Sequence, residues 1–170
     1  MAADLVLVRI DDRLIHGQVV VGWAKVVTPD YIVVANDVVA ADTLQRSLME
    51  LATPSHLGVV ICRVDEIAEA CLHAPLDNKR VLLLFSTPQD LAYAVETGLP
   101  VKRADVGGMR YAPGKRQVLR AVSLDPMDEI CFRALLKKGI KLSVRMVPTD
   151  EEVDIAKFLM PEVIDGPASS

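Results

Sequence analysis

The residues best suited to chemistry lie between 9 and 18, where the sequence reads Arg-Ile-Asp-Asp-Arg-Leu-Ile-His-Gly-Gln. His16 is the reactive candidate, because a neutral imidazole is a nucleophile and an unperturbed imidazole is mostly neutral near pH 7. Arg13 precedes it and carries a cation that offsets part of the charge of a phosphoryl group. The combination predicts a histidine that accepts a phosphoryl group; the alternative is a solvated histidine beside an ordinary salt-bridge cluster.

Residues near His16 can assist the transfer of a phosphoryl group. Either Asp11 or Asp12 can hold one ring nitrogen as N–H and so present the other as the nucleophile, and the sequence leaves both open. Gly17 lets the backbone approach a bulky group without a Cβ in the way. A helix is expected to begin just after His16, which would leave the imidazole exposed at a helix N-terminus, where an anion is favoured.

A second group of candidates follows other apolar runs. The segment from Lys102 to Arg116 carries five bases against one acid. Gly107 and Gly108 within it can turn their amides towards a phosphate, while the bases can dock an acidic partner. The alternative is a flexible loop with solvated charge. Asp37, with Asn36, and the Ser86-Thr87 pair would lie on the same rim, as groove residues or as helix caps.

Composition excludes several classes of function. The chain has 170 residues, a net charge of −4 and only 4% aromatic residues, which argues for one domain without general nucleic-acid affinity. No HxxH or HExxH occurs, and the cysteines lack metal-ligand spacing, so we expect buried thiols, no metal and no cofactor. These cysteines are Cys62, Cys71 and Cys131.

No apolar run reaches the roughly 18 residues of a membrane span, and the N-terminus lacks the basic segment of a signal peptide. We therefore expect a cytoplasmic protein without direct membrane insertion. Trp23 lies on the apolar side of a predicted helix and is expected to pack in the core, while His56 and His73 are expected to be structural or merely exposed.

The elements that must position these residues alternate along the chain. Apolar runs predict strands at 5–9, 31–35, 57–63, 80–85, 104–106, 118–122 and 141–147, and amphipathic patterns predict helices at 17–27, 40–52, 64–72, 88–96 and 126–138. This alternation predicts an α/β fold, a single domain with a central, mostly parallel β-sheet and helices on both faces. Ligands of such sheets gather in loops at the carboxyl ends of strands, which is where His16 falls.

Helix ends are marked by local signals. Thr87 and Asp125 each precede a proline and an acid, as N-caps do, and Thr149 with Glu152 has capping-box spacing ahead of a short C-terminal helix. Glycines follow two predicted helices where C-terminal caps are expected, at Gly98 and Gly139.

Four segments together resemble a known family. RIDDRLIHGQV with Trp23 after it, VVANDVVAAD, LLLFSTPQD and VGGMRYAPGK occur in the order found in the IIB component of the mannose/fructose/sorbose class of the bacterial sugar phosphotransferase system. The resemblance runs from about residue 5 to 160 and implies a IIB domain at 1–160 with a C-terminal tail at 161–170. Val20-Val21-Gly22 is more apolar than the matching stretch of transporter homologues, and the tail is atypical.

The resemblance implies a phosphocarrier enzyme, a protein-phosphohistidine–sugar phosphotransferase without a cofactor. His16 would accept a phosphoryl group, on the Nδ1 side of the ring, from a phosphohistidine of the IIA component. It would pass the group to a sugar bound by the IIC/IID permease, which is also its route to the inner membrane. Arg13 matches the basic residue of the family's loop, and Asp11, Gly17 and Gln18 match motif positions.

Two other functions fit the same residues. One is a phosphorylation-dependent regulatory or binding module that is not coupled to sugar transport. The other is a small-ligand-binding domain without covalent chemistry. The sequence does not identify the sugar, because selectivity belongs mainly to the membrane partner, and it leaves open whether the chain forms a homo-oligomer.

Overall fold

The centre of the protein is a seven-stranded sheet. The structure, a computed structural model, describes residues 1–162, and the strands follow the order β3-β2-β4-β1-β5-β8-β9. All neighbours are parallel except β9, which runs antiparallel to β8. The strands are β1 (Asp4–Ile10), β2 (Tyr31–Ala35), β3 (Gly58–Cys62), β4 (Arg80–Phe85), β5 (Arg103–Val106), β8 (Lys141–Val144) and β9 (Val153–Asp154). A separate hairpin pairs β6 (Arg116–Leu119) with β7 (Val122–Leu124).

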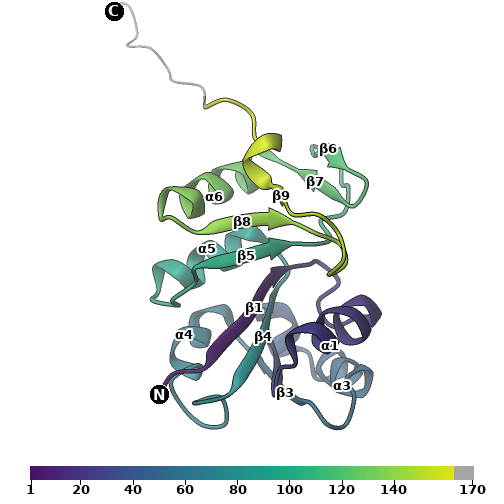
Figure 1. Ribbon diagram of the computed structural model, residues 1–170, viewed down its shortest axis with the longest axis vertical. Helices are drawn as coiled ribbons and strands as arrows, with labels where there is room; N and C mark the ends of the chain where they lie inside the picture. Colours follow the sequence, from purple (N-terminus) through teal and green to yellow (C-terminus); the bar gives the residue numbers. More distant parts are fainter. Residues whose placement is uncertain (163–170) are drawn as a thin grey trace, which may run out of the picture.

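Helices cover both faces of the sheet. Figure 1 shows α4 (Ile67–Ala70), α5 (Pro88–Glu96) and α6 (Pro126–Lys137) on one side and α1 (Ala24–Val27) and α3 (Thr43–Ala52) on the other. The remaining helical elements are the π-helix η1 (Gln18–Trp23), α2 (Asp37–Ala41) and the 3₁₀ turns η2 (Val64–Glu66) and η3 (Ile155–Phe158). The predicted fold class, with a mostly parallel sheet between two helical layers, is confirmed.

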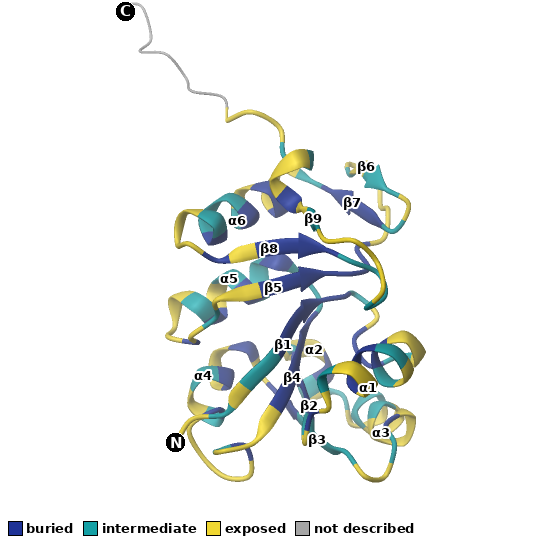
Figure 2. Cartoon of the chain, in the orientation of Figure 1, coloured by how far each residue is buried: buried dark blue, intermediate teal, exposed yellow. Residues whose placement is uncertain are grey.

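Two hydrophobic cores account for the all-apolar strands. Alternate residues of β4 point to opposite cores, with Val81, Leu83 and Phe85 in one and Leu82 and Leu84 in the other. All five of these side chains are fully buried, and Figure 2 shows the centre of the sheet as buried along β1, β4, β5 and β8. A strand that is buried on both faces needs apolar residues at every position, which is why these runs do not alternate with polar residues.

Several helix ends lie where the sequence predicts them. The side chain of Thr87 accepts a hydrogen bond from the backbone of Asp90 at the start of α5, and that of Asp125 caps α6 in the same way. Gly98 and Gly139 follow these two helices with φ values of 110° and 83°, in the region that favours glycine.

Three predicted elements are divided in the structure. The helix expected at 17–27 is the π-helix η1 followed by one α-helical turn. The helix expected at 40–52 is interrupted at Asp42, which is extended and caps α3 through the amides of Leu44 and Gln45. The helix expected at 64–72 is the 3₁₀ turn η2 followed by α4.

Two further predictions are wrong. The run 118–122 is not one strand, because the chain reverses at Arg120 and Ala121 between β6 and β7. Thr149 does not begin a helix, because the neighbouring Asp150 carboxylate accepts hydrogen bonds backwards from the amides of Met146 and Val147. The chain then forms β9, and η3 is capped by Asp154 instead.

The cysteines are free thiols. Cys62 and Cys71 are buried and Cys131 is half-buried. Burial raises the pKa of Cys62 to about 12 and that of Cys71 to about 11, so neither is a thiolate near neutral pH. Within residues 1–162 no helix has the length and apolar character needed to cross a bilayer. The boundary at 160 stays a prediction, and most of the predicted tail lies outside the described residues.

Candidate functional site

The loop with the candidate histidine leaves the carboxyl end of β1, in the interior of the sheet. Ile10, the last residue of β1, lies beside Phe85 of β4 and Val106 of β5. The loop of residues 11–17 is therefore flanked by the segments that follow β4 and β5, as expected for a ligand site of a parallel sheet. The amide of Asp11 fixes the start of the loop by donating to the carbonyl of Phe85, at 2.9 Å.

Asp11 is the centre of the hydrogen bonding in this loop, and its side chain is 0% exposed. Its Oδ1 accepts hydrogen bonds from the backbone N–H of Arg13 at 3.2 Å and from Nε of Arg13 at 3.1 Å, and its Oδ2 accepts one from Nη2 of Arg13 at 3.1 Å. Burial on its own would raise the pKa of Asp11, but the hydrogen bonds from Arg13 outweigh it and hold that pKa below its ordinary value. The carboxylate is therefore buried and ionised.

His16 is less open than the sequence predicts, because only 16% of its side chain is exposed. Nδ1 lies 2.9 Å from the carbonyl oxygen of Leu14, while Nε2 is buried without a hydrogen-bond partner, 3.8 Å from Oδ2 of Asp11. Leu14 has a φ of 56°, a left-handed conformation that is uncommon for a residue with a Cβ and that recurs at functional sites. The bend brings the Leu14 carbonyl to the imidazole.

The two aspartates of the loop have different partners. Asp11 faces His16, whereas Oδ2 of Asp12 accepts hydrogen bonds from the backbone N–H of Arg110 at 2.8 Å and from its Nε at 3.1 Å. The backbone N–H of Asp12 donates to the carbonyl of Gly108 at 2.9 Å. Of the two candidates, Asp11 is the one beside the ring, although at 3.8 Å it makes no hydrogen bond to Nε2, and Asp12 ties the loop to the segment after β5.

The paired glycines after β5 make this close approach geometrically feasible. A Cβ on Gly107 would lie 2.2 Å from Nη2 of Arg9 and 2.7 Å from Oδ2 of Asp11, and one on Gly108 would lie 3.0 Å from Oδ1 of Asp11. The Gly107 N–H, which the sequence offered to a phosphate, donates instead to the carbonyl of Ile10 at 2.7 Å. Because Gly107 and Gly108 lack a Cβ, they leave space for the buried side chains of Arg9 and Asp11.

A cavity of about 450 Å³ adjoins the loop. Arg13 borders it with 38% of its side chain exposed, and its Nη2 also donates to Oε1 of Gln18 at 3.3 Å. Arg110 and Arg120 add positive charge to the same rim. The cavity is lined by Asp12, Arg13, Gln18, Gly108, Arg110, Tyr111, Gln117, Arg120, Ala121, Ser123 and Met146. These arginines make one side of the cavity positively charged, which favours an anion that approaches His16.

Other predicted rim residues lie apart from this group. Asp37 borders a different cavity with Asp90, and its Oδ1 accepts a hydrogen bond from the backbone of Val64 at 2.9 Å. Asn36 caps α2 and donates to the hydroxyl of Ser86. Gly17 precedes η1, with open space where its Cβ would be.

The five bases at 102–116 do not form one cluster. Arg103 pairs with Glu152 at 2.6 Å, Lys115 with Asp128 at 3.1 Å and Arg116 with Glu129 at 2.7 Å. With the pair between Arg110 and Asp12 at 3.1 Å, four of the five charges take part in ion pairs. Of the five, only Arg110 borders the cavity beside Arg13. The predicted basic docking segment is therefore reduced to this residue.

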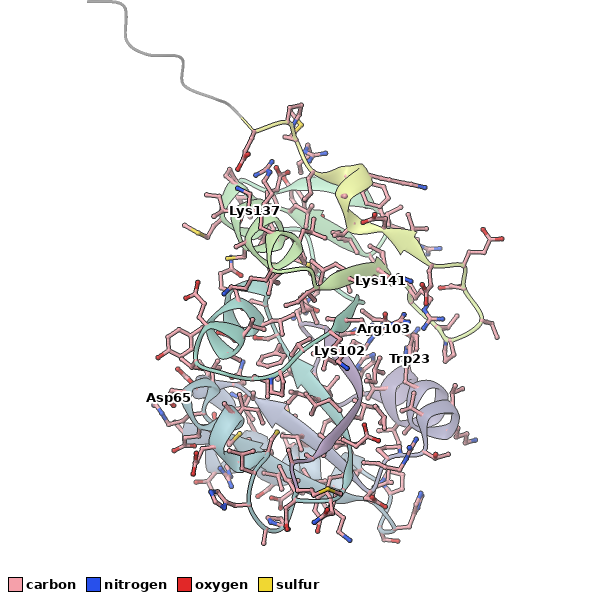
Figure 3. The ribbon with its side chains drawn as sticks, turned by 60° about the vertical axis from the view of Figure 1, so that its left-hand side comes forward. Trp23, Asp65, Lys102, Arg103, Lys137 and Lys141 are labelled. Carbon is pink, nitrogen blue, oxygen red and sulfur yellow. The ribbon has the colours of Figure 1, made fainter. Side chains whose placement is uncertain are left out.

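Sequence reasoning missed Arg9 and the role of Trp23. Arg9 is 0% exposed and donates from Nη1 to the carbonyl of Arg145 at 2.8 Å and from Nη2 to that of Met146 at 3.2 Å. Trp23, on the side of η1 that faces the loop after β8 (Figure 3), donates to the same Met146 carbonyl. The one available signal was a charged residue inside the apolar run of β1.

Fold and site together define a class: a parallel α/β domain that presents a histidine at the carboxyl edge of its sheet, beside an ionised carboxylate and an arginine. Among residues 1–162 no group of three or more histidine, cysteine or acidic side chains is arranged to hold a metal ion.

Comparison with known proteins gives the family. The model of the PTS system sorbose subfamily IIB component matches residues 5–167. The sorbose-specific EIIB component of Klebsiella pneumoniae is 41% identical over 152 residues, 89% of this chain and 92% of that protein. The mannose-specific EIIAB component of Escherichia coli (strain K12) is 40% identical over 90% of this chain, which spans 47% of that longer protein.

A solved structure agrees with these relatives. The crystal structure of the IIBSor domain of the sorbose permease from Klebsiella pneumoniae superimposes with a TM-score of 0.86 at 38% identity, covering 91% of this chain and 94% of that one. The chain belongs to the sorbose subfamily of IIB components of the phosphotransferase system. The resemblance drawn from its motifs is confirmed, and with it the class of enzyme, a sugar phosphotransferase component.

Proposed function

We propose that His16 carries the phosphoryl group of this IIB component, accepting it from a phosphohistidine of the IIA component and passing it to a sugar bound by the IIC/IID permease. The observation that carries the proposal is the placement of one imidazole 3.8 Å from a buried carboxylate that also holds Arg13. His56 and His73, the other histidines, are exposed, and His73 pairs with Glu69.

The transfer step needs a lone pair on the imidazole. A carbonyl oxygen can only accept, so contact with Leu14 makes Nδ1 an N–H and leaves the lone pair of the neutral ring on the buried Nε2. Attack through Nδ1, which the family resemblance implies, therefore requires the His16 ring to turn away from Leu14. The ring proton then exchanges through water from Nδ1 to Nε2, and the same turn must bring Nε2 closer than its present 3.8 Å to Oδ2 of Asp11 for that carboxylate to accept its hydrogen bond.

The bonds in this step balance without a further reactant. The Nδ1 lone pair of His16 forms the new N–P bond while the N–P bond of the donor phosphohistidine breaks. The departing pair stays on the donor imidazole, which leaves neutral because its other nitrogen already holds a proton. His16 becomes a phosphoimidazolium whose N–H faces the Asp11 carboxylate. Positioning and cationic stabilisation must do most of the remaining work.

Arg13 is the cation placed for that stabilisation. Its Nη1 takes no part in the hydrogen bonds among residues 1–162, and part of the side chain faces the adjoining cavity. A unit charge pair at 4 Å is worth about 4 kcal/mol at an effective dielectric near 20, and less where water screens it. Gln18, hydrogen-bonded to Arg13, and Gly17, with open space beside it, complete the surface that the donor would meet.

Partners follow from the same family. One relative carries IIA and IIB in a single protein by its name, which supports a IIA donor for this chain. Transfer to a sugar held by a permease would bring the chain to the inner face of the membrane through that contact.

Transfer onward to sugar tests this function. The chain, labelled by phosphorylated IIA, is mixed with membrane vesicles that contain a mannose-class IIC/IID permease, with and without its sugar. We expect the label to leave the protein and appear on the sugar only when both are present. Label that stays on the chain under these conditions would contradict the transport role.

A further inference from the structure

Arg9 is a fully buried charge that the phosphoryl-transfer step does not itself use. Its guanidinium lies 3.4 Å from Oδ2 of Asp11 and 4.9 Å from the centre of the Trp23 ring. Its Nη1 and Nη2 also donate to the carbonyls of Arg145 and Met146 in the loop after β8, while its Nε is buried without a hydrogen-bond partner among residues 1–162. An arginine in the interior is costly unless such partners satisfy it, so its presence needs a reason.

We propose that Arg9 is a positioning residue for phosphoryl transfer, which rests on the proposed function of His16. Arg9 adds a second cation beside the Asp11 carboxylate and fixes it in place. Asp11 in turn holds Arg13 through three hydrogen bonds and lies 3.8 Å from Nε2 of His16. Arg9 has no exposed surface with which to touch the donor protein or the sugar, so any effect it has must pass through Asp11.

Arg9 changes the net charge of the group of side chains beside His16. Asp11 and Arg13 alone would form a neutral pair, with little attraction for a phosphoryl dianion. Arg9 adds a second cation to the same carboxylate, so the three side chains together carry one net positive charge. Arg13 can then turn part of its charge to the phosphoryl group while Asp11 keeps a partner.

Arg9 also anchors Asp11 to neighbouring segments of the chain. Nη2 of Arg9 binds both Asp11 and the Met146 carbonyl, and Trp23 donates to that carbonyl as well. Three segments therefore meet at the Arg9 guanidinium: the loop of residues 11–17, the helix η1 that follows it and the loop after β8. Any displacement of Arg9 moves Asp11, and with it the bidentate hold on Arg13.

Arg145 provides a matched control. Its guanidinium also lies 4.9 Å from the centre of the Trp23 ring, but its ion pairs are with Asp105 and Glu152, away from Asp11. Arg145→Gln thus removes a positive charge that lies beside Trp23, as Arg9 does, without changing any side-chain contact of Asp11. A purely structural role for Arg9 would make the two variants alike.

Transfer kinetics from phosphorylated IIA test the proposal. We expect Arg9→Gln to lower kcat by about tenfold or more, with KM for the donor unchanged, because lost support of a reactive group commonly weakens activity 10- to 100-fold. Arg9→Lys keeps the charge and should recover part of the rate. By ¹³C NMR the Asp11 carboxyl pKa should rise in Arg9→Gln and stay at its wild-type value in Arg145→Gln.

Equal kcat values and equal Asp11 pKa values in folded Arg9→Gln and wild type would overturn the proposal while leaving His16 as carrier. If wild type itself takes no label, the proposed function fails instead. Should the variants not fold, the ¹⁵N guanidinium resonances of wild-type Arg9 decide: we expect them to shift on phosphorylation more than those of Arg145, and unchanged Arg9 resonances would refute the positioning role.

Discussion

At the scale of single residues, the site is a set of charges arranged around one buried carboxylate. His16, Arg13 and Asp11 could be predicted from the sequence, because they lie within six consecutive residues and their chemistry is local. The choice between Asp11 and Asp12 could not, since it depends on Arg110, which is distant in sequence and binds Asp12. The contacts of Arg9 with Arg145 and Met146, more than 130 residues away, leave no local pattern at all.

Arg13→Ala is the residue-scale prediction. Removing this cation should slow phosphorylation of the chain by about 10²-fold, the effect of losing one donor to a transition-state charge. It also leaves the buried Asp11 carboxylate with one cation fewer, so the midpoint of thermal unfolding should fall while the chain still folds. Rapid-quench kinetics with phosphorylated IIA measure the rate.

Gln117→Ala serves as the control for Arg13, because Gln117 borders the same cavity and, among residues 1–162, its side chain donates only to the carbonyl of Arg120. We expect a small change in rate for this variant. Wild-type kinetics in Arg13→Ala would remove Arg13 from the mechanism.

At the scale of elements, most apolar runs and the caps at Thr87 and Asp125 predicted the structure correctly, whereas the run 118–122, the capping box at Thr149 and the interruptions of helices did not follow the prediction. The strands are predicted because burial on both faces demands consecutive apolar residues, and Thr87 and Asp125 mark their helices through side-chain chemistry. The reversal at Arg120 and Ala121 was missed because it lacks the glycine or asparagine that usually signals a tight turn. The π-helix η1 was missed because Val19 and Trp23, both buried, also suit an α-helix.

Gly107→Ala is the element-scale prediction. The new methyl group would overlap the Arg9 guanidinium and crowd Asp11, so the segment after β5 must move away from the loop of residues 11–17. We expect a destabilisation of about 1–3 kcal/mol, typical of overpacking, together with slower phosphorylation. Denaturant unfolding measures the first effect and donor kinetics the second.

The comparison variant is Gly17→Ala, where nothing lies within 4 Å of the added Cβ and φ is −51°. Its free energy of unfolding should change by no more than about 0.5 kcal/mol. Equal destabilisation by the two substitutions would show that the close packing at Gly107 does not matter.

At the scale of the whole molecule, the order of strands creates the site. β1 lies between β4 and β5, and β8 lies next to β5, so loops that are far apart in the sequence meet at one edge of the sheet. Alternation of apolar and amphipathic segments predicts a parallel sheet, but strand order depends on long-range pairing that no local pattern records. The same order explains why Asp37, after β2, lies apart from His16: β4 separates β2 from β1.

The proposed function requires that the His16 imidazole of this chain carry the phosphoryl group. The most direct measurement is mass spectrometry of the chain after incubation with phosphorylated IIA, under conditions that preserve the acid-labile N–P bond, for wild type and for His16→Ala. We predict a single added phosphoryl group on His16 in the wild type and none in the variant. Phosphorylation of His16→Ala to the wild-type extent, or mapping of the group to His56 or His73, would contradict the account.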